Sequence, residues 1–79
     1  MAIVLPTSTT VLDATGLQCP LPVLKARKAL KALEAGSILK VLATDPSAVD
    51  DFAAYCESSG HTLVDWNEKG GVYKFRLRK

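Results

Sequence analysis

The sequence predicts an α/β (α+β) two-layer sandwich in which two helices cover one face of a four-stranded mixed sheet. Three observations support this prediction: a β-α-β-α-β-β order of segments, an apolar stripe on each helical segment, and strict alternation in the last strand. Alternate residues of that strand are apolar (Tyr73, Phe75, Leu77) and basic (Lys74, Arg76, Arg78). Because the strand has one apolar face, both helices must pack against that face.

The composition indicates a single soluble domain spanning residues 1 to 79. With 48% hydrophobic and 23% charged residues, the chain has the balance of an ordinary globular protein rather than a disordered one. The formal net charge of +2 is small, whereas dedicated nucleic-acid binders usually carry a larger basic excess. Composition therefore favours neither nucleic acid nor a charged surface as the partner.

The first half of the chain contains a strand, a helix and a second strand. Residues 9 to 14 are β-prone and lead into a turn at Thr15 and Gly16. Residues 20 to 34 have helical periodicity, and Gly36 is expected to end that helix. Residues 37 to 44 are apolar on both faces, which is typical of a central strand. The stripe of the helix consists of Val23, Ala26, Leu30 and Leu33.

The second half begins with a helix that Asp45 is expected to cap, with Pro46 in the first helical position. Gly60 is its expected end. Residues 61 to 67 then form a strand, and residues 68 to 71 a hairpin turn before the last strand. The apolar face of this second helix consists of Val49, Phe52, Ala53 and Cys56.

Leader and membrane signals are not found in the sequence. Residues 1 to 10 have neither the basic leader nor the long apolar region of a secretory signal. Nowhere does the chain approach the ~20 consecutive apolar residues that span a bilayer. We therefore expect a cytoplasmic protein, in which thiols stay reduced. The two cysteines are far apart and form neither a CxxC pair nor a zinc motif, so we expect no metal site.

The run Cys19-Pro20-Leu21-Pro22 is the most informative stretch of the chain. Pro20 disfavours a helical backbone at Cys19, so Cys19 is expected at the N-cap, with Pro20 as the first helical residue. A thiolate at that end gains from the helix dipole and from unpaired N–H groups. We therefore expect the pKa of Cys19 to lie below the ~8.5 of a free cysteine. A rigidly held sulfur without a neighbouring base is suited to accepting a group and passing it on.

The stretch LDATGLQCPLPVLKARKAL resembles the signature of the TusA (SirA-like) sulfur-carrier family, in which an aspartate and Gly-Leu-x-Cys-Pro-x-Pro open a helix. The similarity extends from about residue 11 to the basic C-terminal strand and includes Asp45-Pro46, Cys56 and Gly60-His61. The matching motif positions are Asp13, Gly16, Leu17, Cys19, Pro20 and Pro22.

This resemblance implies a β-α-β-α-β-β two-layer fold and a sulfurtransferase-type activity. Cys19 would accept sulfur as a persulfide from a cysteine desulfurase or a rhodanese and relay it to an acceptor protein. It implies no cofactor besides that covalently carried sulfur. Destinations in the family include tRNA thiolation, molybdenum cofactor enzymes and sulfur oxidation, and these residues do not select among them.

Several other residues have two possible roles. The basic residues of the first helix are either a solvated face or a docking surface for the donor or acceptor; they are Lys25, Arg27, Lys28 and Lys31. Asp13 either orients the loop that carries Cys19 or is a solvated strand end. For Cys56 we expect a packing role, for His61 a strand-end position, and for Asp45 a cap without chemistry.

Two other functions share this scaffold. A thiol-based regulator or adaptor would have the same exposed cysteine and differ only in taking up no sulfur. An RNA-binding module would use the basic residues of the open sheet face, with Tyr73 or Trp66 stacking on a base. However, the alternation directs Tyr73 to the core, away from the basic residues, which argues against direct nucleic-acid binding.

Overall fold

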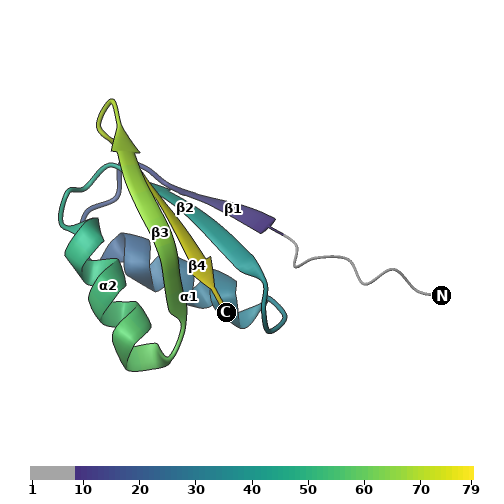
Figure 1. Cartoon of the computed structure of the whole chain (residues 1–79). Helices are drawn as coiled ribbons and strands as arrows, with labels where there is room; N and C mark the ends of the chain where they lie inside the picture. Colours follow the sequence, from purple (N-terminus) through teal and green to yellow (C-terminus); the bar gives the residue numbers. More distant parts are fainter. Residues whose placement is uncertain (1–8) are drawn as a thin grey trace.

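A computed structural model describes residues 9–79 and confirms the predicted order of elements (Figure 1). The expectation about a leader rests largely on residues 1–8, which lie outside the described residues. None of the helices in the described part is long and apolar enough to cross a membrane. The strands are β1 (Thr9–Ala14), β2 (Ile38–Ala43), β3 (Thr62–Lys69) and β4 (Val72–Arg78), and the helices are α1 (Leu21–Lys31) and α2 (Ala48–Ser59).

The four strands form one mixed sheet in the order β1-β2-β4-β3. Strand β1 pairs with β2 in parallel, and β4 pairs antiparallel with both β2 and β3. Both helices lie on the same face of the sheet, as the single apolar face of β4 requires (Figure 1). Ala14 pairs with Ala43, so β1 and the parallel β2 end at the same edge of the sheet. The loops that follow them therefore lie next to each other.

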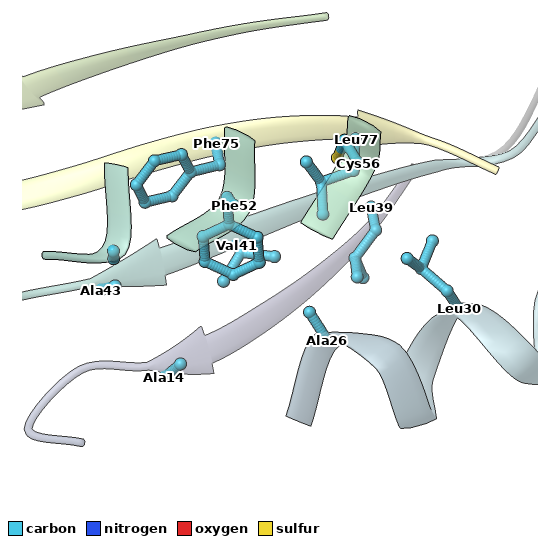
Figure 2. Packing of buried hydrophobic residues seen from close by; sticks show 11 residues of the cluster. Ala14, Ala26, Leu30, Leu39, Val41, Ala43, Phe52, Cys56, Phe75 and Leu77 are labelled. Atoms are coloured by element: carbon cyan, nitrogen blue, oxygen red, sulfur yellow. The ribbon is translucent and has the colours of Figure 1, made fainter. Parts of the chain in front are cut away.

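The core lies between the helices and the covered face of the sheet. The rings of Phe52 in α2 and Phe75 in β4 lie 4.7 Å apart, and both side chains are fully buried (Figure 2). From α1, Ala26 and Leu30 reach the same cluster. The predicted stripes are confirmed, except that Ala53 is exposed on α2. Burying such side chains stabilises the fold by roughly 1.5–3 kcal/mol for each large one.

Both helices begin later than the sequence predicts. The N-cap of α1 is Pro20 rather than Cys19, and the N-cap of α2 is Ser47 rather than Asp45. Before α2, the carboxylate of Asp45 accepts hydrogen bonds from the N–H and the hydroxyl of Ser47, at 3.0 and 2.8 Å. This turn accommodates Pro46 before the helix, so Pro46 is not its first residue.

Glycine ends one of the two helices, α2, but not the other. Gly60 is the C-cap of α2, with a φ of +83° and its N–H bonded to the carbonyl of Cys56, as predicted. Helix α1 instead ends at Lys31, and its C-cap Ala32 is right-handed. The prediction that Gly36 ends α1 is therefore wrong, because the chain leaves the helix several residues before it.

The hairpin between β3 and β4 is tighter than expected. Its turn consists of Gly70 and Gly71, with φ of +60° and +83°, so Glu68 and Lys69 extend β3 instead of belonging to the turn. His61 lies just before β3. In β4, Tyr73 lies on the covered face together with Phe75. Their rings are stacked, with centroids 6.5 Å apart. The basic residues of β4 are exposed on the other face, as predicted, without Tyr73 among them.

Candidate functional site around Cys19

Cys19 is an exposed, free cysteine in the loop between β1 and α1. Its loop meets the loop between β2 and α2, because parallel strands β1 and β2 end at the same edge of the sheet. Between the two loops lies an open recess of about 530 Å³, lined by residues 16–19 and 44–46. The sulfur is therefore carried at the rim of a shallow surface recess. The sequence alone had indicated no such recess.

Two hydrogen bonds between distant parts of the chain hold the Cys19 loop. The N–H of Gly16 donates to the hydroxyl of Thr44 at 2.9 Å, and the N–H of Cys19 donates to Oδ2 of Asp45 at 2.7 Å. Both acceptors lie in the loop that follows β2. The direction of the cysteine is thus set by a second segment of the chain as well as by its neighbouring prolines.

The start of α1 offers the sulfur fewer donors than the sequence suggested. Leu21 is the first helical residue, and its N–H donates to the carbonyl of Gln18 at 2.8 Å. Pro20 and Pro22 have no N–H. This leaves Val23 as the remaining donor of the first turn, and Cys19 lies one residue before the N-cap. The helix-start argument for a stabilised thiolate is weakened accordingly.

The prediction of an acidic Cys19 thiol is wrong, because two aspartates raise the pKa of the thiol. Hydrogen bonding to Asp51, in the first turn of α2, raises the pKa of the Cys19 thiol, and partial desolvation adds to this effect. Ser47 acts in the opposite direction and lowers the pKa, while the charges of Asp51 and Asp45 raise it further. The net effect of these neighbours is to disfavour the thiolate form of Cys19.

Asp13 lies near the end of β1, just before the Cys19 loop. Its Oδ1 accepts hydrogen bonds from the N–H and the hydroxyl of Thr15, at 3.0 and 2.6 Å. These bonds lower the pKa of the Asp13 carboxyl. Lys25 of α1 approaches the same place, with Nζ 3.4 Å from the carbonyl oxygen of Asp13. Asp13 is thus an exposed residue near the end of β1 whose carboxylate also fixes the turn at Thr15.

The remaining motif residues lie around this turn. Gly16 has a φ of +78°, a conformation that residues with a side chain rarely adopt. Leu17 packs against the core, and Pro22 is fully buried at the start of α1. The motif thus combines one residue for the backbone turn with two that anchor the loop and helix to the core.

The structure does not bring every predicted residue to Cys19. The basic residues of α1 (Lys25, Arg27, Lys28, Lys31) are all exposed. Arg27 and Lys31 line a second recess, of about 510 Å³, together with His61 and Tyr55, whose rings lie 5.8 Å apart. His61 belongs to that recess and not to the one beside Cys19. Cys56 is buried in the core, with 4% of its surface exposed.

The sequence did not indicate three features of this site: the role of Thr44, the contact of Asp45 with Cys19, and the role of Asp51. One signal for the first two was available, because the segment after β2 must meet the segment after β1 when those strands are parallel. Asp51 had no such signal, since its side chain reaches Cys19 only through the packing of α2. Among residues 9–79, no cluster of histidine, cysteine or carboxylate side chains could hold a metal ion.

Comparisons with known proteins find relatives that match most of this chain. The chain is 47% identical over 68 residues to the sulfur carrier protein TusA of Allochromatium vinosum. The matching region covers 86% of this chain and 90% of that protein. It is equally similar to the sulfur carrier protein TusA of Pseudomonas entomophila, with 47% identity over 68 residues, covering 86% and 85%.

The crystal structure of a SirA-like protein from Desulfitobacterium hafniense superposes with a TM-score of 0.76 at 30% identity, covering 86% of this chain and 93% of that one. The model of the family described as Sulfurtransferase TusA matches residues 10–79. This match includes all six helices and strands apart from the first residue of β1. The chain therefore belongs to the TusA sulfurtransferase family.

Proposed function

We propose that this protein is a sulfur carrier that accepts sulfane sulfur on Cys19 as a persulfide and passes it to an acceptor protein. The observation that carries the proposal is an exposed, free Cys19 in a loop held by long-range hydrogen bonds to Thr44 and Asp45. The relatives named as sulfur carrier proteins support it. A carrier needs a sulfur that partners can reach, and Cys19 lies at an open rim.

The proposed chemistry needs no oxidant or reductant. The Cys19 thiol loses its proton to water, and the thiolate attacks the outer sulfur of a persulfide on the donor. The S–S bond of the donor breaks, a new S–S bond forms on Cys19, and the donor cysteine leaves as a thiolate. An acceptor thiolate then attacks the outer sulfur on Cys19, the S–S bond on Cys19 breaks, and the released Cys19 thiolate takes a proton from water to restore the free thiol. The sulfur is cargo, so no resident cofactor is required.

The raised pKa of Cys19 has a consequence for the resting carrier. A neutral thiol reacts slowly with oxidants, because the thiolate is the reactive form. Docking of a partner that presents positive charge to Asp51 and Asp45 would relieve the effect that raises this pKa. The donor, which we propose is a cysteine desulfurase or a rhodanese, would thus help to activate the cysteine that it loads.

The exposed basic residues of α1 are the proposed docking surface for the donor or acceptor (Lys25, Arg27, Lys28, Lys31). Lys25 also approaches the Asp13 carbonyl, so it has a structural contact as well. We propose the cytoplasm as the location, where Cys19 would stay reduced between transfers. Transfer RNA thiolation, molybdenum cofactor enzymes and sulfur oxidation are the acceptor pathways that the family resemblance suggests.

Intact mass spectrometry tests the proposal directly. The protein is incubated with a cysteine desulfurase and cysteine, and separately with a small-molecule persulfide. The parent and Cys56→Ala should each gain one sulfur atom that a reductant removes, whereas Cys19→Ser should gain none, because a hydroxyl cannot form a persulfide. A parent that binds partners but takes up no sulfur from either source would instead be the thiol-based adaptor.

A further inference from the structure

The carboxylate of Asp45 joins two loops that are far apart in sequence. Its Oδ2 accepts the N–H of Cys19 at 2.7 Å, while its Oδ1 accepts the N–H and the hydroxyl of Ser47 at 3.0 and 2.8 Å. These hydrogen bonds lower the pKa of the Asp45 carboxyl, the bond from Cys19 most of all. Asp45 therefore remains an anion that connects the Cys19 loop to the start of α2.

The bond to Cys19 acts on the residue that carries the sulfur. Fixing the N–H of Cys19 restricts its φ, and with it the direction in which the Cα–Cβ bond points. The neighbours of Cys19 do not anchor it by burial, because Gln18 and Pro20 are both exposed. A tertiary hydrogen bond is therefore what ties this part of the loop to the body of the protein.

We propose that Asp45 is the positioning residue of the carrier cysteine: its carboxylate holds the backbone of Cys19 so that the sulfur has one fixed direction toward its partner. This role rests on the proposed function, because direction matters only if the sulfur is transferred in line between two cysteines. Misplacing a reacting atom by about 1 Å can cost on the order of a hundredfold in rate.

The sulfur also has other polar neighbours, and they must be separated from Asp45 in any test. Ser47 and Asp51, both at the start of α2, face Cys19 along with Asp45. Asp51 has the larger effect on the thiol, whereas Asp45 binds the backbone N–H and adds only the smallest of the effects that raise the pKa of the thiol. Changes at Asp51 should therefore alter the pH profile of Cys19 and leave the protection of its N–H intact.

The decisive variant is Asp45→Ser. A serine hydroxyl can still accept from Ser47 and keep the turn before α2, but it is too short to reach Cys19. Asp45→Asn keeps a carbonyl oxygen at the original reach and removes the charge. Asp51→Asn changes the charge near the sulfur without removing the backbone bond. Asp50→Ser is the matched control, since Asp50 is an exposed carboxylate beside Asp51 in the first turn of α2.

Three measurements are made on each variant: hydrogen exchange of the Cys19 N–H by NMR, sulfur loading rate by mass spectrometry, and the pH midpoint of Cys19 alkylation. Asp45→Ser should speed exchange and slow loading, each by about tenfold or more, with the alkylation midpoint shifted to lower pH because a negative charge is lost. The charge effect alone would speed loading, because a more acidic thiol supplies more thiolate, so loading that slows despite this shift reports the lost positioning. In Asp45→Asn, loading should recover to the extent that N–H protection recovers. Asp50→Ser should match the parent.

Two results would overturn the proposal. One is loading that stays at the parent rate while the Cys19 N–H loses its protection, and the other is protection that is unchanged in Asp45→Ser. Failure of the proposed function looks different, because the parent itself would then load no sulfur. The hydrogen-exchange measurement still tests the Cys19–Asp45 bond in that case.

Discussion

The hydroxyl of Thr44 accepts a hydrogen bond from the N–H of Gly16 at 2.9 Å, and Gly16 makes this bond with a φ of +78°. A left-handed backbone costs residues with a side chain roughly 1–2 kcal/mol. Nothing lies within 4 Å of where a Cβ would be, so the cost of Gly16→Ala is one of backbone conformation rather than of crowding. We predict that Gly16→Ala lowers the free energy of unfolding by about 1 kcal/mol, measured by urea denaturation.

A matched control separates stability from site geometry in this experiment. Gly70, in the hairpin turn, has a φ of +60° and equally open surroundings. Gly70→Ala should cost a similar free energy of unfolding and leave sulfur loading on Cys19 unchanged. Gly16→Ala should also slow loading. Equal loading rates in the two variants would show that the Gly16 turn does not position the cysteine.

The second prediction concerns the ionisation of Cys19. Because the neighbouring Asp51 raises the pKa of the thiol, alkylation by iodoacetamide should have its pH midpoint above that of free cysteine. In Asp51→Asn the midpoint should move to lower pH, since the variant removes the carboxylate that contributes most to the raised pKa. The rates are measured as a pH series by mass spectrometry. A parent midpoint at or below that of free cysteine would restore the helix-start argument.

The sequence predicted the fold well because the fold follows from local patterns. The alternation of Tyr73, Phe75 and Leu77 requires one covered face of the sheet, and the helical stripes supply its cover. The surroundings of Cys19 were predicted less well. Pro20 and Pro22 correctly marked a helix start, but two residues distant in sequence, Asp45 and Asp51, determine the charge around the sulfur. Their approach depends on the register of β1 against β2 and on the packing of α2.

The third prediction is a loss of stability in acid. Hydrogen bonds from Cys19 and Ser47 hold the folded-state pKa of Asp45 below its ordinary value of 3.8. A carboxyl with a lowered folded-state pKa stabilises the fold above the unfolded-state value, and this contribution is lost as the pH falls through the folded-state value. The urea concentration at the unfolding midpoint should therefore decrease as the pH is lowered from about 5.5 to about 3. This decrease should be smaller in Asp45→Ser. An equal decrease in both proteins would contradict this.

The fourth prediction tests the proposed docking surface of α1. Arg27, Lys28 and Lys31 are exposed, and their reversal to glutamate should weaken loading from a protein donor more than it weakens folding. Lys25 is left unchanged, because its Nζ approaches the Asp13 carbonyl. Loading of the parent should also slow as salt rises, since exposed charges are screened over ~10 Å at about 0.1 M.

The control for charge alone reverses three exposed basic residues elsewhere: Lys69, Lys74 and Arg78. This variant has the same net charge as the α1 variant, so a general electrostatic effect would slow both to the same extent. If α1 is the docking surface, only the α1 variant should load sulfur slowly from a protein donor. With a small-molecule persulfide, both should load at the parent rate.

The last prediction separates the two cysteines by burial. Cys56 lies in the core near Leu77, with 4% of its surface exposed, and burial raises the pKa of its thiol (Figure 2). Cys56→Ala should therefore leave a small cavity and lower the free energy of unfolding by about 1 kcal/mol, while Cys19 still loads one sulfur. Cys19→Ser should instead keep the stability of the parent and take up no sulfur, because Cys19 is exposed and a hydroxyl cannot form a persulfide. Urea denaturation and mass spectrometry on both variants measure the two effects. If Cys56→Ala stays folded but takes up no sulfur, the two cysteines act together, and a carrier with a single thiol is the wrong description of this protein.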